Sequence, residues 1–210
     1  MEKQNIILIG GGDSFSQRED FLKYLKKNEL WDLPSDNPRK SWKIWVKNEL
    51  GDGYYFDIPL MPNKQNAKYD EWKVWFERHL AVVEDSVILI GLSLGAQFLA
   101  KYLIENEIEQ DVKGLFLLAG PCGYFDDPDG MDCATFGFDI ESIGAMRGTA
   151  SHITIMHSKD DFVVPFEHAL QFQAALPEAT LHSFTDKNHF LVEELPELLT
   201  LIRQLAKSST

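Results

Sequence analysis

The residues with the clearest chemical potential form a G-x-S-x-G motif at 91–95, with Ser93 at its centre. This pattern is typical of a nucleophile elbow, a tight turn that joins a buried strand to a helix and lifts the serine hydroxyl above the sheet. The apolar run at 87–90 predicts the strand, and helical spacing of apolar residues after the motif predicts the helix. We therefore expect Ser93 to be a nucleophile, with Gly91 and Gly95 allowing strand and helix to approach closely.

A serine hydroxyl reacts well only when a neighbouring base removes its proton and a third group orients that base. In chains with an elbow, the acid and the histidine follow the serine in that order. Asp160 and Asp161 follow one predicted strand, and His189 follows the next. The sequence thus predicts a triad of Ser93, one of these aspartates and His189. The weaker histidine candidates lie in predicted helices or strands: His79, His152, His157, His168 and His182.

Acyl transfer also needs N–H groups that stabilise the developing oxyanion. The N–H of Leu94 is one expected donor, because it begins the helix after the elbow. The glycines at 10–12 follow the first predicted strand, and we expect the second donor there, from either Gly12 or Asp13. A phosphate-binding loop is the alternative for these glycines. It is disfavoured because G-x-G-x-x-G fails at Phe15 and no P-loop lysine follows.

Alternating strands and helices must position these residues. The predicted strands are at 5–9, 54–58, 87–90, 115–119, 152–157 and 179–184. The predicted helices are at 17–30, 41–50, 69–83, after the elbow, at 166–176 and at 191–205, the last kinked or divided by Pro196. This alternation favours a parallel sheet with right-handed crossovers. The candidate triad then lies beyond the carboxyl ends of strands, where open α/β sheets bind ligands.

Two features allow more than one interpretation. Residues 122–148 have no clean period and are expected to form a small lid; a surface loop with an acidic cation site at 126–132 is the alternative, although the ligand pattern of an EF-hand is missing. The tryptophan pairs Trp42/Trp45 and Trp72/Trp75 are expected to pack in the core, with one indole lining the substrate cleft as the alternative.

The composition limits the class of protein. The chain has 210 residues, 44% of them hydrophobic, so one domain spanning 1–210 is expected. A formal net charge of −13 disfavours nucleic acid and anionic membranes as partners. No apolar segment predicts a signal peptide or membrane span, and the two cysteines, Cys122 and Cys133, predict free thiols in the cytoplasm. We expect no metal and no cofactor, and the oligomeric state is not indicated.

Three stretches, at 91–96, 157–165 and 181–190, together resemble the α/β-hydrolase superfamily. Within it, the chain is similar to the small serine hydrolases of the retinoblastoma-binding hydrolase type. The resemblance implies a three-layer α/β-hydrolase fold around a mostly parallel six-stranded sheet in the order 2-1-3-4-5-6. It implies a small-molecule acyl substrate and a covalent acyl-enzyme. It also assigns the acid to Asp161, four residues before Pro165, rather than to Asp160.

The chain departs from the family in places. Leu92 stands where the family usually has histidine, and residues 14–38 resemble an insertion. No Leu-x-Cys-x-Glu motif surrounds either cysteine, so binding to the retinoblastoma protein is not implied. The favoured hypothesis is a carboxylesterase-like serine hydrolase, with amides or thioesters still open as substrates. The alternatives are a non-catalytic binding protein on the same fold and, more weakly, a nucleotide-binding protein.

Overall fold

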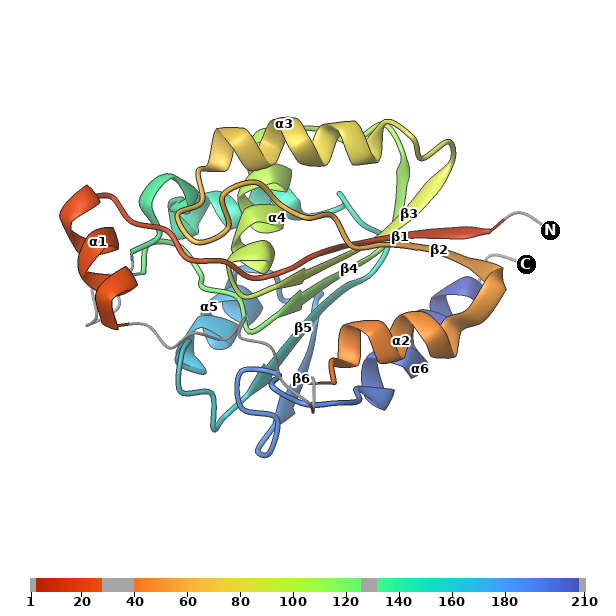
Figure 1. Cartoon of the computed structure of the whole chain (residues 1–210). Helices are drawn as coiled ribbons and strands as arrows, with labels where there is room; N and C mark the ends of the chain where they lie inside the picture. The colour runs from red at the N-terminus through yellow and green to blue at the C-terminus, as the bar shows by residue number, and fades with distance from the viewer. Residues whose placement is uncertain (1–2, 28–39, 126–131, 208–210) are drawn as a thin grey trace.

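The computed structural model describes residues 3–27, 40–125 and 132–207. Their strands form one six-stranded sheet in the order β2-β1-β3-β4-β5-β6, with every neighbouring pair parallel (Figure 1). The strands are β1 (Gln4–Ile9), β2 (Tyr54–Asp57), β3 (Ser86–Leu92), β4 (Asp111–Leu118), β5 (Ile153–Ser158) and β6 (Thr180–Phe184). The predicted fold class and strand order are confirmed.

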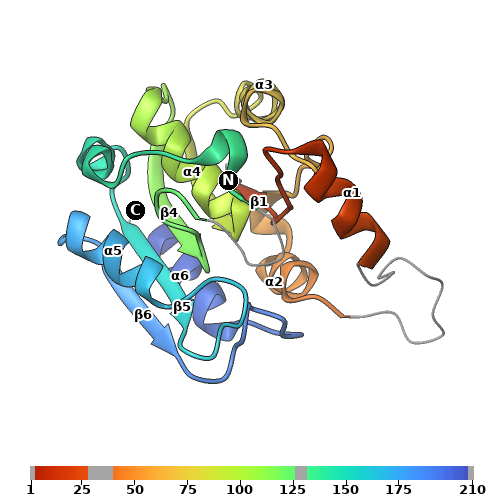
Figure 2. The same cartoon turned by 90° about the vertical axis from the view of Figure 1, so that its left-hand side faces the viewer.

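Helices cover both faces of this sheet (Figure 1). One face carries α3 (Tyr69–Leu80), α4 (Leu94–Glu105) and α5 (Glu167–Ala175). The other carries α2 (Trp42–Leu50) and α6 (Pro196–Lys207). Figure 2 views the molecule from the end of the sheet at which the strands finish, with α1 (Arg18–Lys27) standing beside the loops there. The result is a three-layer sandwich whose loops converge at one end.

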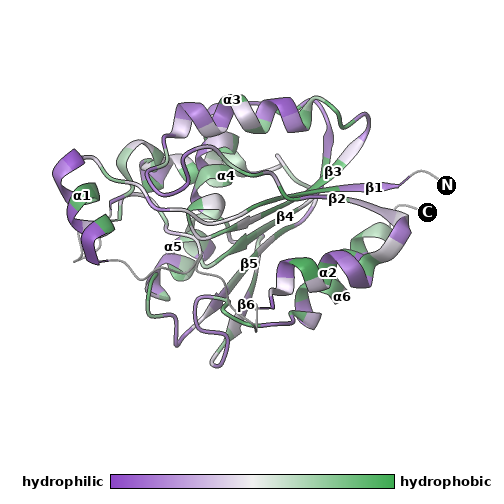
Figure 3. Ribbon diagram, viewed as in Figure 1, coloured by the Kyte–Doolittle hydropathy of each residue, from purple (hydrophilic) through white to green (hydrophobic). Residues whose placement is uncertain are grey.

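The core explains why the strands read as unbroken apolar runs. In β1, Ile7 and Ile9 point into the cluster under α3 and α4, whereas Ile6 and Leu8 point into the cluster under α2 and α6. A parallel strand covered on both faces needs apolar residues at every position. Figure 3 shows the central strands as largely hydrophobic, while α3 carries long hydrophilic stretches.

The last helix differs from its prediction. The sequence predicts a helix from residue 191 that is kinked or divided at Pro196, but α6 starts at Pro196 itself. Proline has no N–H and has a fixed φ, which suits the first position of a helix, where the amide would be unpaired in any case. Proline also disfavours helical backbone in the residue before it. The stretch from Leu191 to Leu195 is therefore a connection outside the helix, and Leu191 and Val192 within it line the cavity described below.

The segment at 122–148 is more ordered than its sequence suggests. Two short 3-10 helices, η2 (Ala134–Phe136) and η3 (Ile140–Met146), lie within it. Phe136 and Ile143 belong to the core cluster beneath α3 and α4. Residues 126–131, which carry most of the acidic run considered for calcium, lie outside the described residues, as do the predicted loop at 32–38 and the end of the helix predicted at 17–30. A lid formed by 122–148 stays a prediction.

The tryptophans divide between core and surface. Trp42 and Trp72 are buried, as predicted, but Trp75 is 37% exposed and packs against Arg78. The inner face of α3 is filled by residues three or four apart that include Trp72, and Trp75 falls to the side of that stripe. Within the described residues, no helix is long and apolar enough to cross a membrane.

Candidate active site

Ser93 occupies the turn between β3 and α4, as the motif predicts. Its backbone has φ +56° and ψ −125°, a strained conformation for a residue with a side chain. The glycines on either side are required sterically. A Cβ on Gly91 would lie 2.5 Å from the Cα of Ala96, and one on Gly95 would collide with the carbonyl oxygen of Ile9. The local sequence therefore builds an elbow that presents the Ser93 side chain beyond the sheet.

Backbone N–H groups lie around this serine. The carbonyl of Ser93 accepts the N–H groups of Ala96 and Gln97, whereas the Leu94 N–H, at the start of α4, finds no acceptor among the described residues. A Cβ placed on Gly11 would lie 3.1 Å from the Cβ of Ser93, which brings the glycine loop against the elbow. Leu94 and this loop thus face the same side chain.

The two candidates for the second donor differ in their hydrogen bonds. The Asp13 N–H donates to the carbonyl of Lys64 at 2.7 Å, so it is already engaged. The Gly12 N–H has no acceptor within the described part of the chain. A Cβ on Gly12 would come within 2.6 Å of the Lys64 carbonyl oxygen, so this turn accepts only glycine without rearrangement. The geometry favours Gly12 over Asp13.

Asp161 and His189 meet across the loops that follow β5 and β6. His189 Nδ1 lies 2.8 Å from Asp161 Oδ2 and 3.1 Å from Oδ1. The Asp161 side chain is fully buried, and that of His189 is 12% exposed. Backbone N–H groups of Val163 and Val164 donate to Asp161 Oδ1 at 2.8 and 3.0 Å. The carboxylate is thus fixed by its own loop and holds the imidazole on its other side.

Asp160 has a different task. Its carboxylate accepts the Ser158 hydroxyl and, at 3.1 Å, the N–H of Asn188. The Ser158 hydroxyl oxygen accepts the N–H of Lys187 at 3.1 Å. Asp160 therefore ties the loop after β5 to the loop that carries His189, and it makes no hydrogen bond to that histidine among the described contacts.

A second imidazole, that of His157, approaches Asp161, although its sequence position made it one of the weaker histidine candidates. His157 Nε2 lies 2.9 Å from the carbonyl oxygen of Val164 and 3.4 Å from Asp161 Oδ2. Since both neighbours are acceptors, Nε2 must carry the hydrogen. The His157 side chain is buried. The sequence contains one indication of this contact: His157 and Asp161 are four residues apart, on either side of the tight turn that follows β5. The two histidines in helices have partners elsewhere: His79 contacts Asp57, and His168 accepts the Cys122 N–H.

These contacts control the charge of the acid. Burial raises the pKa of Asp161, but hydrogen bonds from His157, His189 and the Val164 N–H, with the charge of His189, lower it by more. The pKa of Asp161 therefore lies well below its usual range. A carboxylate that stays ionised can fix the tautomer of a histidine and stabilise its cation.

Ser93 and His189 both line one cavity of about 650 Å³ at the loop end of the sheet. Within the described residues, no hydrogen bond joins the Ser93 hydroxyl to His189, so of the three side chains only Asp161 and His189 are directly bonded. Catalytic hydrogen bonds are often long in unliganded enzymes. Trp42 forms part of the wall and donates from its indole to the Phe190 carbonyl at 3.1 Å, so one core tryptophan also borders the cleft.

The rest of the cavity wall comes from segments far apart in the sequence. They include the glycine loop, the start of α2, residues 64–65 and Asp132 with Cys133. Lysines are prominent among them: Lys40, Lys43 and Lys64. No cluster of three or more metal-ligating side chains occurs among the residues that the structure describes.

A parallel α/β sheet with a serine elbow and an aspartate–histidine pair at its strand ends defines an α/β hydrolase. A family model for serine hydrolases matches residues 35–200, and the chain belongs to that family. The putative hydrolase YdeN of Bacillus subtilis (strain 168) is 26% identical over 155 residues, covering 73% of this chain and 80% of that protein. Serine hydrolase RBBP9 of Rattus norvegicus is 25% identical over 168 residues, covering 78% and 86%.

Solved structures show the same fold. The crystal structure of the ydeN gene product from B. subtilis superposes with a TM-score of 0.71 at 19% identity, covering 98% of this chain and 100% of that one. The meta-cleavage product hydrolase CumD from Pseudomonas fluorescens IP01 has a TM-score of 0.62 at 14% identity, covering 100% and 92%. The resemblance stated from the sequence is confirmed at the level of family and fold.

Proposed function

We propose that the protein is a carboxylesterase-like enzyme that hydrolyses small carboxylic esters through a covalent acyl-enzyme, using Ser93, His189 and Asp161. The observation that carries the proposal is the Asp161–His189 hydrogen bond of 2.8 Å at the rim of the cavity that Ser93 also lines. With Nδ1 held by the carboxylate, Nε2 on the opposite side of the ring is the base for the serine.

In the first step, Ser93 Oγ attacks the carbonyl carbon of the ester while His189 Nε2 takes the hydroxyl proton. Asp161 keeps the imidazole in the required tautomer and stabilises the imidazolium. The carbonyl π electrons move to oxygen, and the N–H groups of Leu94 and Gly12 receive that oxyanion. Losing one such donor typically lowers turnover by about 100-fold or more.

The tetrahedral intermediate collapses when the carbonyl re-forms and the C–O bond to the alcohol breaks. His189 gives its proton to the leaving alkoxide, so an alcohol departs and Ser93 stays acylated. Water then attacks the acyl carbon with His189 as base, and the second collapse returns the proton to Ser93 Oγ. The products are one alcohol and one carboxylic acid for each water consumed.

Covalent labelling tests the nucleophile. We expect a fluorophosphonate probe to label the native protein at Ser93 and to leave Ser93→Ala unlabelled. Ser151→Ala is the control, because Ser151 is exposed just before β5, at the far end of the sheet from the cavity. A panel of p-nitrophenyl esters of increasing acyl length should be hydrolysed by the native protein and the control, and by Ser93→Ala only at background rate.

The opposite result would favour the binding-protein alternative. A native protein that is folded by circular dichroism, unlabelled by the probe and inactive on every ester would not be a serine esterase. In that case Ser93 and His189 would stay without a hydrogen bond even when a ligand occupies the cavity. An enzyme would instead form this hydrogen bond when substrate binds.

A further inference from the structure

The cavity wall is rich in lysine, although the chain as a whole is acidic. The protein has a formal net charge of −13, yet three lysines line the cavity that holds Ser93. Lys40 is paired with Glu193 at 3.4 Å, with both side chains largely exposed. Lys43 and Lys64 form no ion pair with any residue that the structure describes. Lys43 and Lys64 are therefore the two lysines of the cavity wall that can pair with an anion bound in the cavity.

Lys43 is placed by the first turn of α2. Its Nζ lies 3.6 Å from the position that a Cβ on Gly10 would take, beside the glycine loop that contacts the elbow. The side chain is partly buried. Burial lowers the pKa of Lys43, and the nearby charge of Lys64 lowers it further. An ammonium group withdrawn from water beside a like charge is costly unless an anion approaches it.

The carboxylates of the same cavity do not supply that anion. Asp132 receives backbone N–H groups from Ser16 at 3.0 Å and Ala134 at 2.8 Å, and it joins two loops. Asp13 accepts the hydroxyl of Tyr24 at 3.0 Å. Burial raises the pKa of Asp13, against smaller lowering effects from Tyr24 and Lys64, which disfavours its charged form. Neither carboxylate forms an ion pair with Lys43.

We propose that Lys43, supported by Lys64, forms an anion subsite beside Ser93 that binds a carboxylate of the substrate. This inference rests on the proposed function and narrows its substrate class to esters whose acyl chain ends in an acid. We choose a carboxylate because it can be carried by the acyl chain of the ester itself, as in the monoester of a dicarboxylic acid. No arginine lines the cavity within the described residues, so lysine point charges alone would hold this anion.

Two matched esters test the preference. Mono-p-nitrophenyl glutarate and p-nitrophenyl pentanoate have acyl chains of similar length, and only the first ends in a carboxylate. After correction for spontaneous hydrolysis, we expect the native protein to favour the acidic ester at least tenfold in kcat/KM, as a charge-assisted hydrogen bond allows. Lys43→Gln should bring the ratio close to one. Added salt should reduce the native ratio, because the interaction is between charges.

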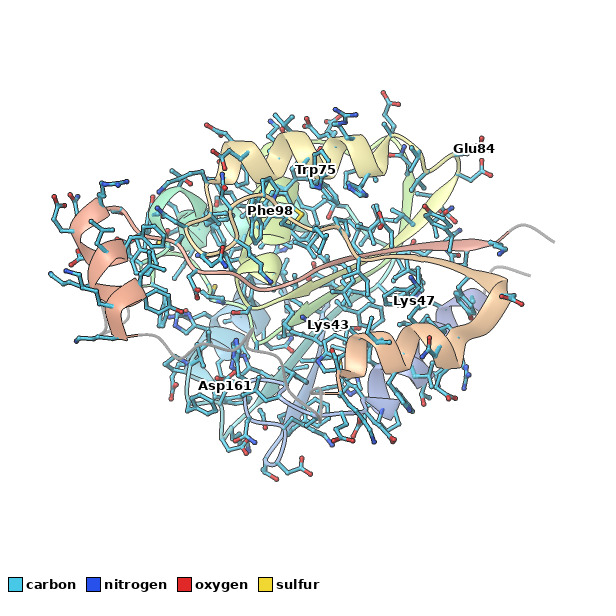
Figure 4. The ribbon with its side chains drawn as sticks, in the orientation of Figure 1. Lys43, Lys47, Trp75, Glu84, Phe98 and Asp161 are labelled. Carbon is cyan, nitrogen blue, oxygen red and sulfur yellow. The ribbon has the colours of Figure 1, made fainter. Side chains whose placement is uncertain are left out.

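Lys47→Gln is the matched control. Lys47 lies one turn further along α2, is exposed and does not line the cavity (Figure 4, where Lys43, Lys47 and Asp161 are labelled). It removes the same charge from the same helix, so a general electrostatic effect would appear in both variants. We expect the native preference in Lys47→Gln. A native ratio near one, or a ratio that Lys43→Gln leaves unchanged, overturns the subsite.

A binding measurement separates this inference from the proposed function. We expect calorimetry to show glutarate binding to the native protein at least tenfold more tightly than glutaramide, and Lys43→Gln to lose that difference. If the fluorophosphonate labels Ser93 but the acid is not favoured in either assay, the subsite fails and the esterase proposal stands. If the probe does not label Ser93 but glutarate binds through Lys43, the esterase proposal fails and the subsite stands.

Discussion

The two sides of the cavity are built in different ways. On one side, Asp161 and His189 come from consecutive strand ends and are fixed by short hydrogen bonds, two of which come from the backbone N–H groups of Val163 and Val164. On the other side, the glycine loop, the start of α2, Lys64 and Asp132 come from four distant parts of the chain. The first side has one arrangement that its loops impose. The second depends on packing between segments that are far apart in the sequence. It contacts the loop of His189 through Trp42, whose indole donates to the Phe190 carbonyl at 3.1 Å.

The contrast predicts that changes on the Asp161 side lower kcat, and that changes on the opposite side raise KM when they leave the Leu94 and Gly12 N–H groups in place. The strongest test compares adjacent aspartates. Asp161→Asn should lower kcat by about 1000-fold or more, because the histidine loses the charge that fixes its tautomer. Asp160→Asn keeps an oxygen that can accept the Ser158 hydroxyl and the Asn188 N–H and removes only the charge, so it should cost less than about tenfold. Ester kinetics on both variants would reverse our assignment if Asp160→Asn were the more damaging change.

His157 provides the next largest effect. His157→Leu removes a donor from the buried carboxylate, and we expect kcat to fall by about tenfold or more, with His157→Gln restoring part of it. Ester kinetics on both variants measure this effect. A kcat in His157→Leu equal to the native value, or no recovery in His157→Gln, would mean that His157 only fills space.

Acid stability provides a smaller effect on the same side. The pKa of Asp161 is lowered in the folded protein, so its stabilisation is complete above the ordinary unfolded value near pH 4 and is lost as the pH falls below that. Asp161→Asn should remove this contribution, about 1–3 kcal/mol of pH-dependent stability between about pH 5 and pH 2. Urea unfolding at both pH values measures it. Equal pH dependence in native protein and variant would contradict it.

The smallest effect belongs to the opposite side. Asp132→Asn keeps one acceptor for the N–H groups of Ser16 and Ala134 but removes the charge that strengthens both bonds. We expect KM to rise by about two- to fivefold with kcat nearly unchanged, since the reacting groups are not touched. A fall in kcat with constant KM would mean that this wall also positions the catalytic groups.

The same contrast explains what the sequence could predict. The spacing of Gly91, Ser93 and Gly95 is typical of one local backbone turn, so a five-residue pattern locates it. Asp161 and His189 each follow a predicted strand, so the order of strands in the sequence locates them as well. The engaged N–H of Asp13 could not be found this way, because its acceptor belongs to Lys64, in a loop after another strand. The contact of His157 with Asp161 depends on the conformation of the loop that follows β5, which no short pattern describes. Lys43 carries no motif at all, and only packing brings it to the cavity.

The backbone of Ser93 has a consequence for the evolution of this chain. At φ +56°, glycine would have less backbone strain than a residue with a side chain. We expect Ser93→Gly to be inactive and yet to melt no lower than the native protein, and above it if the relief of strain exceeds the added freedom of the unfolded chain. On the proposed function, a descendant that loses the reaction could carry glycine at this turn without loss of stability, so the Ser93 hydroxyl serves the reaction and not the fold.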